Sequence, residues 1–161
     1  MLDKNLLLVD IGGTNIRYAY SNIGDSGFVS ENKAELDSLN DFDNLMSVLL
    51  AESDVKHIVF SVAGPKVNNS IKMTNRNFEI DAHEIRKRFN LESCYLLNDW
   101  ESIGYSIRTF AENDFDTFKE GEPFNDTFLV IGPGTGLGAS VISGNNVIAT
   151  EIGNTNLGLS A

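Results

Sequence analysis

The sequence predicts an α/β fold built around a mixed sheet, and three observations support this prediction. Apolar segments at residues 6–11 and 16–20 are joined by a Gly-Gly-Thr-Asn turn, which is typical of an antiparallel hairpin. Apolar runs at 57–63 and 94–97 indicate buried strands, and helical periodicity lies between them. The resulting order is three strands, then helix, strand, helix, strand and helix. This order favours a mixed sheet over a purely parallel one.

The first elements follow from the spacing of apolar residues. A weaker third strand is expected at residues 28–34, after a Gly-Asp-Ser-Gly turn. Residues 41–51 carry apolar side chains at helical spacing and predict an amphipathic helix. The strand at 57–63 ends at a Gly-Pro pair. Asp81 predicts the start of the next helix, because Glu84 lies three residues later and completes a capping box.

The later elements begin with a helix that Asp99 opens and that is expected to reach Phe110. Ile103 and Ile107 lie four residues apart and are expected to form its core face. The acidic, Gly- and Pro-containing segment 111–126 is the best candidate for a junction. Strands are expected again at residues 128–131, 139–143 and 147–150.

The composition is that of a globular chain with an acidic charge. Its 161 residues suffice for one domain with a core, or for a small domain and part of another. A net charge of −11 argues against a nucleic-acid partner. No apolar stretch approaches the ~20 residues of a membrane-spanning helix, and the N-terminus lacks a signal-peptide pattern. The single cysteine, Cys94, is expected in the core, which fits a reducing cytoplasm.

The first glycine-rich loop follows Asp10, which ends a buried strand. Glycine at Gly12 and Gly13 lets a phosphate approach the backbone closely, and Thr14 and Asn15 add a hydroxyl and an amide. The alternative is a tight hairpin turn that Asp10 caps, since glycine, asparagine and aspartate are also common turn residues.

The second glycine-rich loop spans residues 132–138 and contains more glycine than a plain hairpin needs. It matches neither the P-loop pattern nor the dinucleotide-binding fingerprint, so those two phosphate-binding folds are disfavoured. Two loops of backbone N–H groups and a carboxylate at a strand end are nevertheless what a polyphosphate and a hydroxyl nucleophile require.

Two strand-end carboxylates are candidates for that chemistry. Asp99 follows Asn98 at the end of a buried strand, where it is fixed in place as a general base must be. A helix N-cap explains the same residue, and the two roles are compatible. Glu151, near Asn154, is a second carboxylate that can bind hydroxyl groups.

Five motifs follow the order and approximate spacing of those in the bacterial glucokinases, a family of the hexokinase and actin-like superfamily. These motifs are Val9-Asp10-Ile11-Gly12-Gly13-Thr14-Asn15, Ser61-Val62-Ala63-Gly64-Pro65, Met73-Thr74-Asn75, Leu97-Asn98-Asp99 and Gly132-Pro133-Gly134-Thr135-Gly136-Leu137-Gly138. The chain resembles about the N-terminal half of a family member. The resemblance implies a ribonuclease H-like, actin-like ATPase domain with a mixed five-stranded sheet and flanking helices, plus the start of a second domain.

The resemblance also implies roles for individual residues. Asp99 would be the general base for the 6-hydroxyl of glucose or a related hexose, and the phosphoryl donor would be ATP. Sugar hydroxyls would be bound by Asn98, Asp99, Glu151 and Asn154. The phosphates would lie against Gly12, Gly13, Thr14, Asn15, Gly134, Thr135 and Gly136. Asp10 would orient Mg²⁺, through water.

By the same resemblance, residues 1–110 form a small domain and residues 111–161 the incomplete start of a larger one. Where the family usually reads Glu-Gly-Gly-His, this chain has Glu151-Ile152-Gly153-Asn154, so the particular hexose stays open. We expect either self-association or a missing C-terminal half. A sugar kinase of the related ROK type and a kinase-derived regulator are further possibilities within the superfamily. The alternative from another class is a non-catalytic sugar- or partner-binding remnant.

Overall fold

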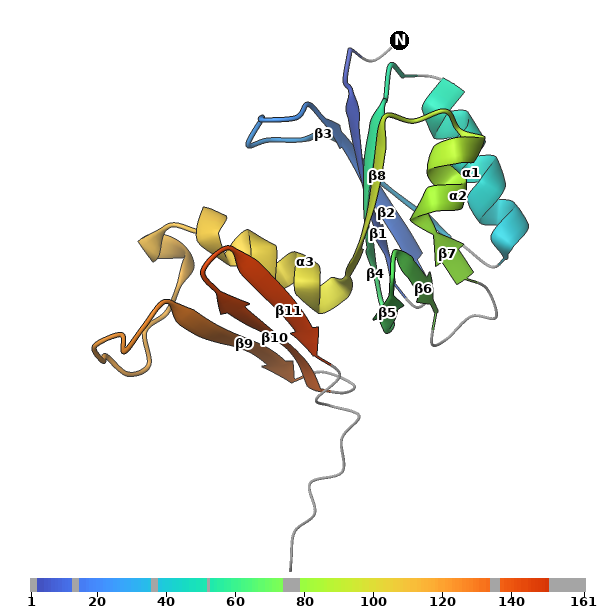
Figure 1. Ribbon diagram of the computed structural model, residues 1–161. Helices are drawn as coiled ribbons and strands as arrows, with labels where there is room; N and C mark the ends of the chain where they lie inside the picture. Colours follow the sequence, from blue (N-terminus) through green and yellow to red (C-terminus); the bar gives the residue numbers. More distant parts are fainter. Residues whose placement is uncertain are drawn as a thin grey trace, which may run out of the picture. The chain divides into compact units, whose positions relative to one another are not determined.

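The computed structural model in Figure 1 describes residues 3–12, 15–35, 38–51, 53–73, 79–133 and 137–150. Contacts within the chain divide it into two units, Met1–Asp99 and Trp100–Ala161. The boundary between these units lies at the start of helix α3. The domain boundary expected between residues 110 and 111 stays a prediction.

The first unit is built on a mixed five-stranded sheet, as predicted. Its strand order is β3-β2-β1-β4-β8, in which β1 pairs antiparallel with β2 and parallel with β4. Strand β8 pairs parallel with β4 at one edge, and β3 pairs antiparallel with β2 at the other. The strands are β1 (Leu6–Ile11), β2 (Asn15–Ser21), β3 (Val29–Glu35), β4 (His57–Val62) and β8 (Ser93–Asn98).

Helices α1 (Leu39–Ala51) and α2 (Ala82–Arg88) lie together on one face of this sheet (Figure 1). Side chains of β1 and β4 alternate in burial along the strands, as a pleated sheet with one covered face requires. The ring of Phe42 in α1 lies 5.9 Å from that of Phe60 in β4, between centroids. The hydrophobic core of this unit therefore lies between the sheet and the two helices.

The predicted start of α2 is confirmed. The carboxylate of Asp81 accepts hydrogen bonds from the backbone N–H groups of His83, at 2.7 Å, and Glu84, at 3.0 Å. These bonds satisfy two of the amide groups that a helix leaves unpaired at its first turn.

A small antiparallel sheet in the first unit was not predicted. It consists of β5 (Lys66–Val67), β6 (Ser70–Lys72) and β7 (Glu79–Asp81), in that order. Strands of two or three residues are too short for an alternating pattern to be recognised in the sequence. Ile71 and Ile80 are paired in register and buried, so this sheet adds to the core.

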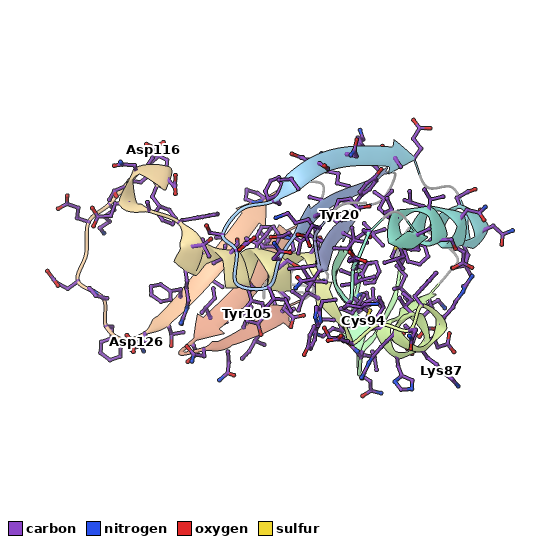
Figure 2. All side chains as sticks on the ribbon, turned by 90° about the horizontal axis from the view of Figure 1, so that it is seen from above. Tyr20, Lys87, Cys94, Tyr105, Asp116 and Asp126 are labelled. Carbon is purple, nitrogen blue, oxygen red and sulfur yellow. The ribbon has the colours of Figure 1, made fainter. Side chains whose placement is uncertain are left out.

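The second unit contains α3 and a three-stranded antiparallel sheet in the order β11-β10-β9. Helix α3 (Asp99–Ser106) is followed by two 3₁₀ turns, η1 (Ile107–Thr109) and η2 (Glu112–Asp114). The strands are β9 (Thr127–Pro133), β10 (Leu137–Ser143) and β11 (Asn146–Thr150), each slightly longer than predicted. Figure 2 shows the acidic segment between Asp116 and Asp126 as an extended loop.

The predicted core face of α3 was wrong. Ile103 is 38% exposed, whereas Glu101 and Gly104 are the buried residues of the helix. The α-helix also ends at Ser106 and not at Phe110, because the next turn tightens into η1. Glycine at position 104 lets the sheet approach the helix closely, and this contact selects the buried face.

One face of the β9–β11 sheet carries exposed apolar side chains. Gly132 of β9 lies against Trp100, so the alternating residues Leu129 and Ile131 point to the opposite face. Leu129 is 61% exposed and Ile131 is 57% exposed. Leu137 and Ile148 share this face through their strand register and are exposed as well. Among the described residues, no helix is long and apolar enough to cross a membrane.

Candidate functional site

The carboxyl ends of three parallel strands meet at one edge of the five-stranded sheet. Ile11, Val62 and Asn98 are the last residues of β1, β4 and β8, and they are partners in one row of the register. Neighbouring strands lie about 4.8 Å apart, so the loops that follow this row begin within about 10 Å of one another. Ligands of open α/β sheets bind at such an edge.

Hydrogen bonds join the three strand ends to one another. The N–H of Ala63 donates to the carbonyl of Ile11 at 3.3 Å. The side-chain Nδ2 of Asn98 donates to the carbonyl of Gly64 at 2.9 Å. The backbone of Gly64 has a φ of 145°, a conformation that favours glycine, so the residue type at this bend is required by the fold. The loop after β4 thus connects the ends of β1 and β8.

Asn98, a predicted sugar ligand, is held rigidly. Its side chain is only 3% exposed, and a buried amide is costly unless it is hydrogen-bonded. The bond to Gly64 fixes which end of the amide is the nitrogen, and with it the direction of the carbonyl oxygen Oδ1. The orientation of the whole amide group of Asn98 is therefore fixed.

Asp99, the predicted general base, is the first residue of α3 and directly follows the end of β8. It is half-buried. Its backbone is therefore held by a strand on one side and a helix on the other. This placement agrees with a fixed carboxylate, and it agrees equally with a helix cap.

Asp10, the predicted magnesium ligand, is exposed near the end of β1. Its register partners are Arg17 on β2 and Ser61 on β4, and directly opposed residues place their side chains on the same face of a sheet. The sequence analysis did not single out Arg17. The register of the predicted hairpin would have revealed it, because a tight turn sets which residues oppose each other.

Gly12 closes the hairpin after Asp10 but is not required by it. Its N–H donates to the carbonyl of Asn15 at 2.9 Å. A Cβ at Gly12 would lie 3.6 Å from that oxygen, an ordinary contact, and the backbone there lies outside the left-handed region. Neither packing nor backbone conformation therefore requires glycine at position 12. Close approach of a ligand to the backbone would require it.

Several predicted site residues lie outside the described part of the chain. These are Gly13, Thr14, Gly134, Thr135, Gly136, Glu151 and Asn154. Of the described residues, Asp10, Gly12, Asn98 and Asp99 lie at the carboxyl ends of β1 and β8 or directly after them, and Asn15 begins β2. The contributions of the second glycine-rich loop and of Glu151 stay predictions.

The residues present fit a water-mediated magnesium ion. Within the described ranges, no group of three or more His, Cys, Asp or Glu side chains could enclose a metal ion. Mg²⁺ usually keeps several water molecules and binds one or two carboxylates together with phosphate oxygens. The exposed carboxylate of Asp10 at a strand end meets that requirement.

A polar cavity of about 250 Å³ lies elsewhere in the first unit and includes none of the predicted site residues. Its lining includes His83 and Arg86 of α2 and Cys94 of β8. Figure 2 shows Cys94 next to α2. Burial raises the pKa of the Cys94 thiol from 9.0 to about 12, with a further contribution from the Asp81 charge. Cys94 is 6% exposed, which confirms it as a core residue.

Comparisons with known proteins identify a family and a fold that this chain resembles. A family profile described as Glucokinase matches residues 7–160. The chain is 30% identical over 145 residues to a glucokinase of Erwinia tasmaniensis and 30% identical over 150 residues to one of Nostoc punctiforme. These matches cover 86% and 88% of this chain but 44% of each relative. The chain thus spans less than half the length of these curated relatives.

Two solved structures share the fold. A glucokinase from an Antarctic psychrotroph superposes with a TM-score of 0.76 at 24% identity, over 100% of this chain and 54% of that one. A glucokinase from Balamuthia mandrillaris in complex with glucose gives a TM-score of 0.67 at 20% identity, over 92% of this chain and 48% of that one.

Proposed function

The chain belongs to the glucokinase family, and from this premise we propose that it supplies the N-terminal half of an ATP-dependent hexose kinase. The reaction is transfer of the γ-phosphate of ATP to the 6-hydroxyl of glucose or a related hexose. The observation that carries the proposal is that Asp10, Asn98 and Asp99 all lie in, or within one residue of, the same row of strand ends. A similar fold binds glucose in the Balamuthia protein, which supports a hexose as the substrate.

Asp99 acts as the general base in this proposal. Its carboxylate accepts the proton of the sugar 6-hydroxyl as that oxygen attacks the γ-phosphorus, and the bond from this phosphorus to the bridging oxygen of ADP breaks. A positioned base contributes about 10² to 10⁴ in rate. Asn98 binds a neighbouring sugar hydroxyl through the amide that Gly64 orients, and Glu151 and Asn154 bind further hydroxyls.

The phosphates are held by backbone N–H groups in this proposal. Gly12, Gly13, Thr14 and Asn15 form one side of the phosphate site, and Gly134, Thr135 and Gly136 form the other. Phosphoryl transfer depends mainly on positioning and charge stabilisation, which such loops supply. Magnesium, when bound, neutralises charge on the phosphate oxygens, and Asp10 holds its water shell. Arg17 lies on the same sheet face as Asp10 and adds a positive charge there.

The exposed face of the β9–β11 sheet is the proposed docking surface for the remaining part of a glucokinase-length polypeptide. Contiguous exposed apolar side chains mark interaction sites, and this face contains Leu129, Ile131, Leu137 and Ile148. The relatives carry more than half of their length beyond what this chain matches. When the 161-residue chain is alone, we expect the same face to cause self-association. The buried thiol of Cys94 fits the predicted cytoplasmic location.

The test is ADP release by the purified chain with ATP, Mg²⁺ and glucose, in parallel with Asp99→Asn and the matched control Asp116→Asn. Asp116 is an exposed carboxylate in the acidic loop and has no proposed role. Glucose-dependent release that Asp99→Asn abolishes and Asp116→Asn retains would support the proposal. Wild-type turnover by Asp99→Asn would mean that Asp99 only caps α3.

If the isolated chain releases no ADP, binding measurements distinguish the two candidate functions. Calorimetric titration with glucose and with MgADP is the measurement, and Asp99→Asn should bind glucose within a few-fold of wild type. Binding of both ligands supports half of a kinase site. Binding of glucose without MgADP favours the non-catalytic remnant.

A further inference from the structure

The polar cavity of about 250 Å³ in the first unit borders the open edge of β8. In the described sheet β8 is an edge strand and pairs with β4 alone. Cys94 and Tyr95 are neighbours on this strand and both line the cavity, although successive side chains of a strand point to opposite faces. The cavity therefore runs along the edge of the strand.

This edge presents a backbone donor to the cavity. The N–H of Ser93 donates to the carbonyl of Lys56, on the side of β4, at 3.3 Å. Backbone groups of successive strand residues point to alternate sides, so the N–H of Cys94 points away from β4. The carbonyl of Leu96 has the same phase, and it accepts a hydrogen bond from Nζ of Lys66 at 3.2 Å. The cavity thus has an amide donor on its β8 side.

Helix α2 supplies further donors from its side chains. His83 and Arg86 lie three residues apart on one face of α2, and both line the cavity. Nε of Arg86 donates to the carbonyl of Leu91 at 3.4 Å, which orients the guanidinium. Its two terminal nitrogens have no partner among the residues that the structure describes. Such a planar fork matches the two oxygens of a carboxylate or a phosphate.

The charges around the cavity favour an anion beside Arg86. Burial and the charge of Asp81 raise the pKa of the Cys94 thiol, and the charge of Arg86 opposes them, so this cation acts at Cys94. The carboxylate of Asp81 already accepts hydrogen bonds from the N–H groups of His83 and Glu84. Its negative charge is therefore partly compensated by the start of α2.

Glu92 adds an acceptor to the lining. Its carboxylate lies 3.6 Å from Nε2 of His57 and is 68% exposed. A negative charge in the lining disfavours a bare anion, and it favours a ligand that also carries a hydroxyl donor. The volume corresponds to about eight water molecules at ~30 Å³ each, which suits a compound of few atoms and is too small for a nucleotide.

We propose that this cavity is a second ligand site, which binds a small organic oxyanion, a phosphate ester or a carboxylate, that also carries a hydroxyl group. The oxyanion lies against Arg86, His83 and the N–H of Cys94, and the hydroxyl donates to Glu92. Asn98 of the proposed kinase site is three residues beyond Tyr95, about 10 Å along β8. The proposal uses no residue of that site and is independent of the proposed function.

The experiment is a ¹H–¹⁵N NMR titration of the 161-residue chain with glycerol 3-phosphate and, separately, with glycerate. At least one probe should shift the amide signals of Cys94 and Tyr95 saturably, with a Kd of about 1 mM or lower. The signal of Gly12 at the proposed kinase site should stay unchanged. The tighter probe identifies the phosphate ester or the carboxylate as the preferred group. Absence of saturable shifts at Cys94 with both probes would overturn the proposal.

Substitutions on α2 separate recognition by the fork from general attraction of anions. Arg86→Lys keeps the positive charge and loses the fork, so it should weaken binding of the tighter probe at least about tenfold. The control Lys87→Gln removes a charge from an exposed residue next to Arg86 that is not part of the described lining. It should bind within about twofold of wild type. Wild-type affinity in Arg86→Lys, or an equal loss in Lys87→Gln, would contradict the assigned site. Unchanged melting temperatures of both variants check that the fold is retained.

Discussion

At the residue scale, Gly12 and Gly64 lie after neighbouring strands but are glycine for different reasons. A Cβ at Gly12 would meet only the carbonyl of Asn15 at an ordinary distance. Gly64 has a φ of 145°, which side chains with a Cβ rarely adopt. Gly64 is therefore explained by the fold, and Gly12 by the proposed phosphate contact.

The first prediction compares Gly12→Ala with Gly64→Ala. Gly64→Ala should lower the free energy of unfolding by about 1–3 kcal/mol, because its backbone conformation becomes strained. Gly12→Ala should change that free energy by less than about 1 kcal/mol and should weaken MgADP binding. Urea unfolding and calorimetric titration measure the two effects. Unchanged MgADP affinity in Gly12→Ala would remove Gly12 from the phosphate site.

The second prediction concerns the pH dependence of Cys94. Burial raises its thiol pKa from 9.0 to about 12, so the folded protein holds the proton at pH values where the unfolded chain releases it. This stabilising contribution is complete below pH 9 and is lost as the pH rises from 9 through 12. The difference in unfolding free energy between wild type and Cys94→Ala should therefore shift against wild type above pH 9. A pH-independent difference would contradict the raised pKa.

A second measurement on Cys94 uses thiol reactivity. Because the thiolate is the reactive form, Cys94 should react with Ellman's reagent much more slowly in the folded chain at pH 8 than in urea. Rapid reaction of the folded protein would show that the thiol is accessible and ionised.

At the element scale, α3 shows where sequence periodicity misleads. Ile103 and Ile107 have the spacing of a core face, yet the helix packs through Trp100 and Gly104. Helical periodicity is recognised from the positions of apolar side chains. A glycine that permits close packing has no side chain and is therefore missed. The glycines at 132 and 138 were likewise assigned to a phosphate loop as a group, whereas these two accommodate the indole.

The remaining elements show what local patterns can predict. Strands β1, β4 and β8 of the mixed sheet are mostly apolar runs, and Asp81 has the spacing of a helix cap, so these elements were predicted correctly. The hydrogen bond from Asn98 to Gly64 joins residues that are 34 positions apart in the sequence, and no local sequence pattern encodes it. Arg17 became a candidate only through its register with Asp10. The site's strand ends were predictable, and the register of the predicted hairpin would also have placed Arg17 opposite Asp10, whereas the contact from Asn98 to Gly64 was not predictable.

The third prediction tests the packing of α3 with Gly104→Ala and the control Gly121→Ala. An added methyl at Gly104 meets Ser140 and Val147, and overpacking of this kind costs about 1–3 kcal/mol. A methyl at Gly121 meets nothing within 4 Å, so the control should leave stability unchanged or slightly raised. Urea unfolding monitored by the fluorescence of Trp100, the only tryptophan, measures both. Equal stability of the two variants would refute close packing at Gly104.

At the scale of the whole molecule, the two units differ in how well their sheets are covered. In the first unit, α1 and α2 cover one face of a five-stranded sheet and enclose a core. In the second unit, the three-stranded sheet turns apolar side chains outward on the face away from α3. A small sheet with one exposed apolar face tends to associate with another surface, because burial of that face lowers the free energy.

The last prediction is that the 161-residue chain self-associates through this open face, although its net charge of −11 opposes association. Replacing Leu129 and Ile131 by lysine should shift the sedimentation coefficient to that of a monomer, because the charges would be buried on association. The control replaces Val48 and Val67 by lysine, two exposed apolar residues of the first unit, and changes the net charge equally. Control and wild type should associate alike at equal ionic strength. A monomeric wild type, or a control that dissociates as fully as the Leu129 and Ile131 variant, would show that the open face does not drive association.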